Sequence, residues 1–202
     1  MTGNEMQQAQ YLPSFASDNA PVAALAVQEP QPLFDAFALN THAERKNGGY
    51  VLNGVKSLVP RAAECELLVI AAMLDGSARL FIVESKTMGL SLQAEPAMGL
   101  RAAATARLAL NQVQLDANAL LGSADDYAEC IALSRLAWCA LATGCGQAVL
   151  DHVIPYANER IAFGEPISHR QAVAFMIANI SVELEGLRLA TWRAAAKAER
   201  GE

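Results

Sequence analysis

The sequence predicts an α+β protein in which an antiparallel β-barrel or β-sandwich domain precedes a long helical hairpin. Between residues 22 and 115, short apolar runs alternate with turn signals rich in Gly, Asn and Asp, and no helical period intervenes. From residue 123 onward the apolar residues follow a helical period, which breaks at Gly164. Strands gathered ahead of helices are typical of α+β folds rather than of alternating α/β folds.

A short polar helix and a series of strands are expected before residue 123. The helix covers Asn4–Leu12 and should stop before Pro13, because proline disfavours helical backbone in the preceding residue. Asn53-Gly54 and Asp75-Gly76 are dipeptides favoured in tight hairpins, so each is expected to reverse the chain. The apolar alternation slips near residues 111–112, which indicates a β-bulge. The expected strands cover residues 22–27, 41–44, 50–52, 55–59, 67–73, 79–83, 90–95 and 107–115.

Two long helices are expected after the strands. Ser123 is suited to cap a helix running from Asp125 to about Ile161, whose first turn holds acidic residues near the positive helix end. The run from Ser168 to Gln171 fits a capping box that starts the second helix, which continues nearly to the last residue. The second helix is expected to bury one apolar face made of Val173, Ile177, Ile180, Leu184 and Leu187.

Composition excludes several classes of protein. The chain has 202 residues, of which 53% are hydrophobic and 18% charged, and its net charge is -6. These values indicate a folded chain, and the lack of a basic stripe argues against nucleic acid as a partner. The cysteines show no C-x-x-C spacing and no nearby histidines, so no metal site is expected. We expect reduced, mostly buried thiols and a cytoplasmic protein without a signal peptide; the cysteines are Cys65, Cys130, Cys139 and Cys145.

One stretch of the first long helix imitates a membrane span. Residues Ile131–Leu150 match a bilayer crossing in length and contain a single charge, Arg135. Several Gly, Ser, Thr and Gln residues dilute the stretch, and acidic residues stand just before it. A helix buried on all sides has the same composition, so we expect a buried helix rather than a membrane span.

Five segments carry a family resemblance. The longest and most specific is Tyr156–Ala172, YANERIAFGEPISHRQA, which is similar to the pattern Y-a-x-x-R-x-x-F-G-x-P-I-x-x-x-Q-a. The others are Gly3–Pro13 (GNEMQQAQYLP), Leu25–Pro30 (LAVQEP), Gly49–Lys56 (GYVLNGVK) and Met98–Leu110 (MGLRAAATARLAL). In order and spacing, these segments resemble the acyl-CoA dehydrogenase family over nearly the whole chain.

The resemblance implies three parts of a larger subunit, cut at both ends of the family's usual length. Residues 1–20 would be the remnant of an N-terminal helical domain, residues 21–122 the middle β domain, and residues 123–202 half of a C-terminal four-helix bundle. The family uses FAD to oxidise the Cα–Cβ bond of acyl-CoA thioesters in fatty acid metabolism. The implied partners are an acyl-CoA, an electron-transfer flavoprotein or similar acceptor, and further copies of the chain in a homodimer or homotetramer.

The resemblance also implies which residues of the helical part would touch FAD. Arg160 would contact the FAD diphosphate across a subunit interface, which suits the donor fork of a guanidinium. The alternative is a solvated arginine that closes a helix end. Phe163 would pack against the cofactor, or else plug the turn beneath it. Gln171 would reach FAD from the same neighbouring subunit, or else pair with Ser168 in the capping box.

The β part would hold the edge of the flavin ring. Val27 and Gln28 lie where the family offers backbone N–H groups and a threonine hydroxyl; the alternative is ordinary sheet residues that face solvent. The family's Trp-Ile-Thr beside the flavin becomes Leu58, Val59 and Pro60, and proline has no N–H to donate. The family's loop E-P-g-a-G-S-D becomes EPQPLFD at residues 29–35, which replaces its glycine and serine. FAD remains the expected cofactor, with an altered flavin edge.

The resemblance leaves the catalytic base unassigned. Most members carry their glutamate near the C-terminus, beyond the point where this sequence ends. A minority place it one residue before an arginine that matches Arg135, and the preceding residue here is Ser134. A serine hydroxyl cannot act as a carboxylate base, and Glu129 lies more than a turn away. Arg135 would line the acyl site or form a buried structural ion pair; the second role is favoured.

Three functions remain open at this point. The first is an FAD-dependent acyl-CoA dehydrogenase-like oxidoreductase, inactive as this 202-residue chain because the base is missing. The second is a non-catalytic paralogue that serves as a binding or oligomerisation scaffold. The third is a flavin-dependent oxidase or monooxygenase on the same fold. The apolar helix faces also predict self-association.

Overall fold

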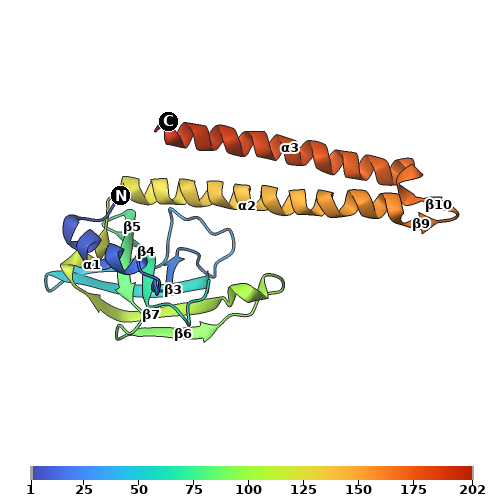
Figure 1. Ribbon diagram of the computed structural model, residues 1–202. Helices are drawn as coiled ribbons and strands as arrows, with labels where there is room; N and C mark the ends of the chain where they lie inside the picture. The colour runs from blue at the N-terminus through green and yellow to red at the C-terminus, as the bar shows by residue number, and fades with distance from the viewer. Residues whose placement is uncertain (1, 202) are drawn as a thin grey trace. The chain divides into compact units, whose positions relative to one another are not determined.

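The computed structural model describes residues 2–201, and the chain divides into two compact units between Ala128 and Glu129. The first unit contains helix α1 (Glu5–Phe15) and a β-sheet, and it includes the first turn of helix α2 (Ala124–Glu159) (Figure 1). The second unit contains the rest of α2 and helix α3 (Gln171–Glu199). Strands followed by a long helical hairpin confirm the predicted fold class.

The sheet of the first unit has the strand order β6-β7-β3-β2-β4-β5-β8, and β1 adds to it by pairing with β4. Its core contains fully buried side chains from strands β3, β4, β5 and β7, among them Leu52, Leu68, Phe81 and Leu108. The strands are β1 (Ala23–Ala26), β2 (His42–Lys46), β3 (Gly49–Val59), β4 (Leu67–Leu74), β5 (Ser77–Glu84), β6 (Leu90–Ala94), β7 (Ala106–Leu115) and β8 (Leu120–Leu121).

The sheet is mixed and is not closed into a barrel, which corrects the expectation of an antiparallel barrel or sandwich. Strand β1 runs parallel to β4 over Leu67–Ile70, and β2 then meets the same edge of β4 at Met73, also in parallel. Long connections permit parallel pairs: residues 27–66 separate β1 from β4. Alternating apolar residues indicate a strand but not its direction, so the sequence could not reveal this arrangement.

The hairpin predicted at Asn53-Gly54 is wrong, because β3 runs straight through it. The chain reverses earlier, at Asn47 and Gly48, whose φ angles of 52° and 79° are those of a tight primed turn. Asp75-Gly76 does form the predicted hairpin between β4 and β5.

Asn53-Gly54 instead faces the predicted bulge near residues 111–112, which is confirmed. The β3–β7 register shifts between Leu52 and Gly54, and Gln112 takes a positive φ of 52°. The Asn53 side-chain oxygen accepts hydrogen bonds from both the backbone N and the side-chain Nε2 of Gln112, each at 2.9 Å. The asparagine therefore satisfies the backbone group that the bulge removes from the ladder.

Helix α1 continues through Pro13 to Phe15, so the predicted stop before Pro13 is wrong. Its start is a capping box: Asn4 accepts from the Gln7 backbone N–H, and the Gln7 side chain accepts from the Asn4 N–H. The buried Gln7 side chain also donates to the carbonyls of Asn118 and Leu120, at 2.6 Å and 2.9 Å. These bonds fix the helix to the short segment after β7.

Helix α2 begins as the sequence predicts. The Ser123 hydroxyl accepts from the Asp126 backbone N–H, and the Asp126 carboxylate accepts from the Ser123 N–H at 2.6 Å. The predicted capping box before α3 is wrong, because Ser168 lies in a short 3-10 turn (Ile167–His169) and Arg170 occupies the cap position without a side-chain bond. A hairpin of β9 (Ile161–Ala162) and β10 (Glu165–Pro166) separates the two helices.

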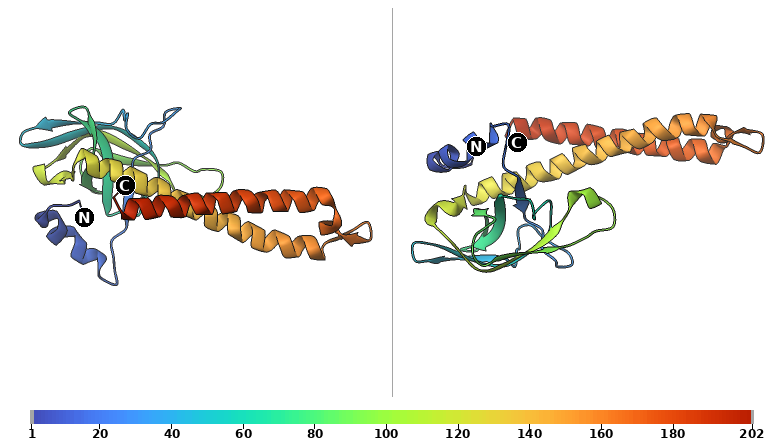
Figure 2. Two further views of the ribbon diagram at one scale, coloured as in Figure 1. Left: turned by 90° about the horizontal axis from the view of Figure 1, so that it is seen from above. Right: turned by 60° about the horizontal axis from the view of Figure 1, so that its bottom comes forward.

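Within the second unit, α2 and α3 lie side by side and run in opposite directions (Figure 2). Buried residues recur every seven positions: Thr143, Leu150 and Ala157 on α2, and Leu184 and Thr191 on α3. A seven-residue repeat is the period of two helices packed along a coiled-coil seam. The predicted α3 face is only partly correct, since Leu184 is buried but Ile180 and Leu187 are 43% and 36% exposed.

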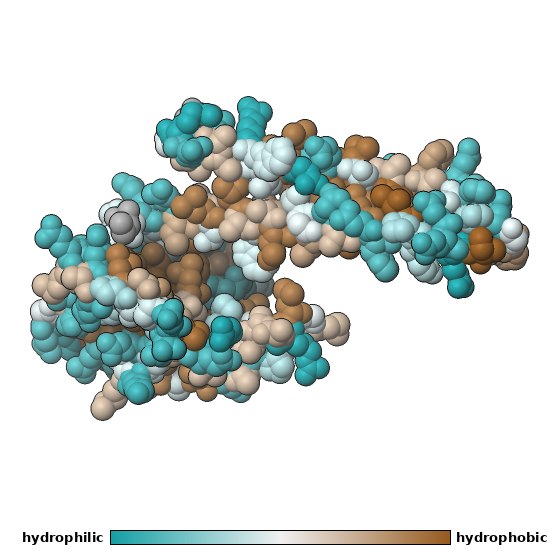
Figure 3. All heavy atoms as spheres, in the orientation of Figure 1, coloured by the Kyte–Doolittle hydropathy of each residue, from teal (hydrophilic) through white to brown (hydrophobic). Residues whose placement is uncertain are grey.

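Much of the apolar surface of both helices is exposed, which corrects the prediction that Ile131–Leu150 is a helix buried on all sides (Figure 3). Among the described residues, α2 alone is long and apolar enough to cross a membrane by length and composition, and a single such helix is weak evidence for a span. The exposed large side chains on the two helices include Leu133, Trp138, Leu141, Val149, Ile154, Phe175, Met176, Val182, Leu189 and Trp192.

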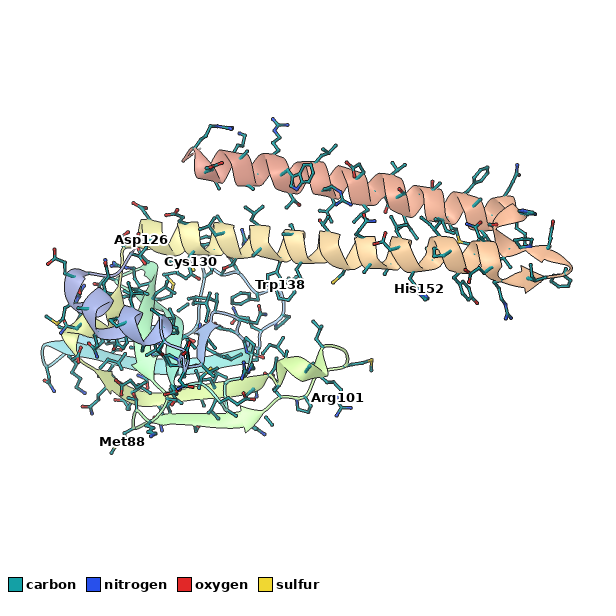
Figure 4. The ribbon with its side chains drawn as sticks, in the orientation of Figure 1. Met88, Arg101, Asp126, Cys130, Trp138 and His152 are labelled. Atoms are coloured by element: carbon teal, nitrogen blue, oxygen red, sulfur yellow. The ribbon has the colours of Figure 1, made fainter. Side chains whose placement is uncertain are left out.

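The four cysteines are free thiols, and only Cys65 is buried. Cys130 is half-buried, while Cys139 and Cys145 are exposed on α2, so the expectation of mostly buried thiols is wrong. Figure 4 marks the place of Cys130 in the first half of α2. Within residues 2–201, no group of three or more His, Cys, Asp and Glu side chains comes together that could hold a metal ion.

Candidate functional site

The turn between α2 and α3 brings together three residues that the sequence marks for cofactor binding: Arg160, Phe163 and Gln171. Arg160 directly follows α2, Phe163 forms the β9–β10 turn, and Gln171 begins α3. Phe163 and Gly164 have φ angles of 55° and 86°, as in a primed two-residue turn. The Arg160 carbonyl accepts a 2.9 Å hydrogen bond from Ile167 N, which closes the base of this hairpin.

The Arg160 guanidinium is open to solvent. Its backbone N–H bonds to the Tyr156 carbonyl as the last turn of α2. Among the ion pairs of residues 2–201, none involves Arg160, so no described carboxylate neutralises its charge. A guanidinium held at its base and unpaired at its tip can form bidentate hydrogen bonds with phosphate oxygens. An ion pair within residues 2–201 would occupy the guanidinium and hinder phosphate binding, and Arg160 forms no such pair.

Phe163 projects from the tip of the hairpin and is 95% exposed, which rules out the alternative that it plugs the turn. The Arg170 guanidinium lies 5.0 Å from the centre of its ring and donates a 3.2 Å hydrogen bond to the Ala162 carbonyl. Arg170 thus supports the ring by a cation–π contact while it holds the hairpin backbone. An exposed aromatic ring supported in this way offers one free face to a ligand.

Gln171 is exposed, and within the described part of the chain its side chain takes part in no capping bond with Ser168. The capping alternative is therefore wrong. The first turn of α3 is stabilised instead by backbone bonds from Val173 and Ala174 to the Arg170 carbonyl. The Gln171 amide remains available to a ligand at the positive end of α3.

The two segments expected at the flavin edge are residues 27–28 and residues 58–60 with the preceding Ser57. In the first unit these flavin-edge segments are in direct contact. The Ser57 backbone N–H donates a 2.9 Å hydrogen bond to the Gln28 carbonyl, which joins residues 27–28 to the end of β3. The Gln28 side chain is exposed just beyond β1, and Val27 is half-buried. These segments are twenty-nine positions apart in sequence numbering, from 28 to 57, so their meeting depends on the sheet.

The segment at the end of β3 differs from a simple extended strand. Leu58 takes a positive φ of 53° and is 47% exposed, whereas Val59 is 1% exposed in the core and Pro60 is exposed. The Glu95 carboxylate accepts the Leu58 backbone N–H at 2.8 Å and the Ser57 hydroxyl at 2.8 Å and 2.9 Å. The Leu58 N–H is therefore already bonded within the chain, and Val59 can offer only its backbone.

A buried ion pair lies behind the flavin-edge segments. Lys56 Nζ is 2.8 Å from Glu29 Oε1, and the two side chains are 0% and 2% exposed. Burial lowers the pKa of Lys56 to about 8, although Glu29 acts in the opposite direction. Burial acts to raise the pKa of Glu29, but hydrogen bonds from Lys56, Thr41 and Asn40 together outweigh it and leave that pKa below its ordinary value.

The segment that replaces the glycine and serine of the loop is only partly exposed, because Phe34 is half-buried. Leu33 is fully exposed and has a positive φ of 53°, a conformation that glycine adopts without strain. Nearby, the buried Tyr127 hydroxyl donates to the Ala36 carbonyl, and the Phe37 ring packs edge-on against Tyr127 at 5.7 Å. The loop after Asp35 is therefore fixed, although its sequence departs from the family pattern.

The residues near the alternative base position lie on α2. Ser134 is half-buried, and Arg135 and Glu129 are exposed. Arg135 is exposed, so the burial expected for a structural ion pair is not seen at this residue. A hydroxyl at position 134 can donate or accept a hydrogen bond but cannot accept a proton from carbon as a carboxylate does.

Sequence reasoning missed three residues that organise the flavin edge: Glu29, Lys56 and Glu95. Glu29 and Lys56 fall inside the segments LAVQEP and GYVLNGVK, so charged residues within largely apolar segments were the available signal. Glu95 carries no such signal. Its role depends on the pairing of its backbone with Thr105, to which it is joined by bonds of 3.0 Å and 2.7 Å.

These residues suit a flavin dinucleotide unevenly. The α2–α3 turn offers a guanidinium and an amide that have no side-chain partner among residues 2–201, together with an exposed ring, and these groups fit a diphosphate and an aromatic group. The flavin edge offers fewer donors, since Leu58 N–H is bonded to Glu95 and Pro60 has no N–H. The cofactor's phosphate side therefore fits the residues present better than its ring edge does.

Comparison with known proteins identifies the same family in both parts of the chain. The acyl-CoA dehydrogenase middle domain matches residues 24–113, and the acyl-CoA dehydrogenase C-terminal domain matches residues 126–202. An acyl-CoA dehydrogenase of Bacillus subtilis (strain 168) is 31% identical, covering 98% of this chain and 55% of that protein. The mitochondrial short-chain specific acyl-CoA dehydrogenase of Bos taurus is 32% identical, covering 96% of this chain and 49% of that protein.

A solved structure of glutaryl-coenzyme A dehydrogenase with glutaryl-CoA has a TM-score of 0.86 at 30% identity, covering 98% of this chain and 52% of that one. The chain thus spans about half the length of the relatives it matches. Matching domains, motifs in family order and a shared fold agree: the chain belongs to the acyl-CoA dehydrogenase family.

Proposed function

We propose that this chain is the FAD-binding part of an acyl-CoA dehydrogenase-like oxidoreductase that acts on the CH–CH bond of acyl-CoA thioesters. The observation that carries the proposal is the α2–α3 turn, where Arg160 is exposed and unpaired among residues 2–201 beside an exposed Phe163 and Gln171. Donors of this kind can bind the phosphates of a dinucleotide, and an exposed ring can pack against its aromatic part.

Each residue of the turn has a distinct part in this proposal. Arg160 binds diphosphate oxygens through its guanidinium, and Gln171 donates its amide at the positive end of α3. Phe163 packs against the cofactor with the ring face that Arg170 leaves free. As in the family, these residues would serve the cofactor of a second copy in a homodimer or homotetramer.

The β unit would hold the flavin edge through Val27, Gln28, Leu58, Val59 and Pro60. When bound, FAD supplies the acceptor for hydride. The chain's own contribution is the rigid junction in which the Gln28 carbonyl accepts the Ser57 N–H at 2.9 Å. Reoxidation would require an electron-transfer flavoprotein or a similar acceptor.

The chemistry also requires a base and a thioester site. The equivalent of the alternative base is Ser134, so we expect this 202-residue chain to bind flavin without oxidising acyl-CoA. Arg135, exposed on α2, is the candidate to meet the acyl-CoA. Anaerobic mixing with butyryl-CoA should leave the flavin absorption unchanged, and bleaching would contradict the absence of a base.

The affinity for FAD tests the proposal directly. The Arg160→Gln variant should bind FAD at least tenfold more weakly than the unmodified chain, because it loses a charge-assisted phosphate contact. Arg45→Gln is the matched control, since Arg45 is also exposed but lies on β2. Titration followed by flavin fluorescence measures both. Equal affinity in the three proteins, or no binding by any, would contradict the proposal.

A second candidate is a non-catalytic paralogue that serves as an oligomerisation scaffold. The specific observation in its favour is the bond from Leu58 N–H to Glu95, which occupies a donor at the flavin edge. A scaffold of this kind would purify colourless and would bind no FAD after reconstitution, yet would still form oligomers. A flavin-dependent oxidase or monooxygenase would instead bind FAD and react with oxygen after chemical reduction.

A further inference from the structure

The Glu29–Lys56 pair joins three separate segments of the first unit. Lys56 Nζ contacts Glu29 Oε1 at 2.8 Å and donates to the Val27 carbonyl at 3.1 Å. The two Glu29 oxygens also accept backbone N–H groups, from Asn40 at 2.7 Å and from Thr41 at 2.9 Å. One carboxylate and one ammonium therefore fix the segment that follows β1, the end of the next loop and the last part of β3.

These bonds lie immediately behind the flavin edge. Val27, whose carbonyl Lys56 binds, precedes Gln28, and Ser57, which follows Lys56, donates to the Gln28 carbonyl at 2.9 Å. Two adjacent residues of β3 thus hold two adjacent residues that follow β1. Neither Glu29 nor Lys56 is exposed enough to touch a ligand, at 2% and 0% of the side chain.

Stability alone does not explain why an ion pair occupies these two buried positions. Removing two charges from water costs free energy that their attraction recovers only in part, and apolar pairs of similar size are often equally stable. The pair differs from an apolar substitute in what it bonds: three backbone groups outside any regular ladder receive a partner. Its distinctive effect is thus to fix backbone position.

We propose that Glu29 and Lys56 are positioning residues that hold the Val27–Gln28 backbone against Ser57 and thereby set the affinity of the flavin edge for its ligand. This inference rests on the proposed FAD binding, and it assigns to two buried residues a role beyond folding.

The test uses the double variant Glu29→Gln/Lys56→Met, because a single change would leave one buried charge unpaired. The control is Arg45→Gln/Asp75→Asn, which removes an exposed ion pair of 3.1 Å from the same unit. FAD affinity is measured by fluorescence titration, and backbone position by amide hydrogen exchange at Gln28, Thr41 and Ser57. Circular dichroism at the titration temperature establishes the folded fraction.

The double variant should bind FAD at least tenfold more weakly per folded molecule and should exchange the Ser57 amide at least tenfold faster; the control should change neither. Unchanged affinity and exchange in a folded double variant would overturn the inference and leave the pair a structural role only. Should the variant not fold, Lys56→Arg provides the second test, since it keeps the charge but displaces the donor; unchanged FAD affinity would overturn the inference. If the unmodified chain binds no FAD, the proposed function fails, and the exchange of Ser57 still decides the positioning role.

Discussion

At the scale of single residues, the buried Glu29 and Lys56 make the free energy of unfolding depend on pH, Glu29 in the acidic range and Lys56 in the alkaline range. The pKa of Glu29 lies below its ordinary value of 4.5, so its contribution is present above that pH and is lost as the pH falls through the folded pKa. The pKa of Lys56 is lowered from 10.5 to about 8, so the folded chain releases this proton before the unfolded chain does. The contribution of Lys56 therefore increases as the pH rises from about 8 to about 10.5.

Urea denaturation at several pH values checks both directions. Relative to Glu29→Gln/Lys56→Met, the unmodified chain should gain on the order of 1–3 kcal/mol of unfolding free energy between pH 7.5 and pH 10. Below pH 4, its free energy of unfolding should fall relative to that of the double variant. A relative loss on the alkaline side would contradict the lowered pKa of Lys56.

Gly54 is a residue whose replacement should be costly. It takes a φ of 149°, and a Cβ at this position would stand 2.6 Å from both Cα and Oγ1 of the buried Thr41. Gly54→Ala should therefore lower the unfolding free energy by roughly 2–4 kcal/mol, through overpacking against backbone. Gly48→Ala is the control: φ is 79° but no atom lies within 4 Å of the added Cβ, so the loss should be about 1 kcal/mol. Equal losses in the two variants would show that the contact with Thr41 is not the cause.

At the scale of elements, two glycines of α2 separate helix propensity from packing. A Cβ on Gly144 meets nothing within 4 Å, whereas a Cβ on Gly146 would lie 2.7 Å from Leu184 Cδ1 on α3. Gly144→Ala should stabilise the helical unit by about 1 kcal/mol, because alanine restricts the unfolded chain and favours helix. Gly146→Ala should give a smaller gain or a loss, since Leu184 must move. Thermal denaturation of the two variants ranks them, and a larger gain for Gly146→Ala would contradict the α2–α3 contact.

Elements that depend on local chemistry were predictable from the sequence. The start of α2 could be predicted because the Ser123 side chain caps the helix at Asp126. The β4–β5 turn could be predicted because Asp75 and Gly76 suit the positive φ angles of a tight hairpin. Asn53-Gly54 shows the limit, because the dipeptide suits a bulge as well as a hairpin. The choice between bulge and hairpin depends on contacts with Thr41 and Gln112, which are distant in sequence.

The candidate site was predictable to the extent that it lies in one continuous motif. Arg160, Phe163 and Gln171 fall within the seventeen-residue motif Tyr156–Ala172 and lie at or beside one turn. The flavin edge could not be predicted in the same way, because its backbone is held by distant side chains. Glu95 accepts the Leu58 N–H, and Lys56 donates to the Val27 carbonyl. Those contacts depend on strand order and register, and alternating apolar residues do not specify either.

At the scale of the whole molecule, the exposed apolar side chains of the helical unit predict self-association. Trp192 is 62% exposed and lines a groove of about 500 Å³ with residues of α2 and α3. Apolar surface of this kind is usually covered by another chain or segment. Sedimentation velocity should show dimers or larger species at micromolar concentration, and Trp192→Glu should shift them toward monomer. Met98→Glu, a fully exposed apolar residue of the other unit, is the control; a monomeric unmodified chain would contradict the prediction.

The way Glu29 closes its loop bears on how new sequence could be accommodated. The two ends of the loop are tied to each other by one carboxylate, at Glu29 itself and at the N–H groups of Asn40 and Thr41, so the stretch from Pro32 to Asp35 contributes little to closure. Lengthening such a tethered stretch costs only about 0.6 kcal/mol for each doubling. We therefore expect this stretch to tolerate changes in length, or an inserted recognition peptide, at little cost to the stability of the sheet.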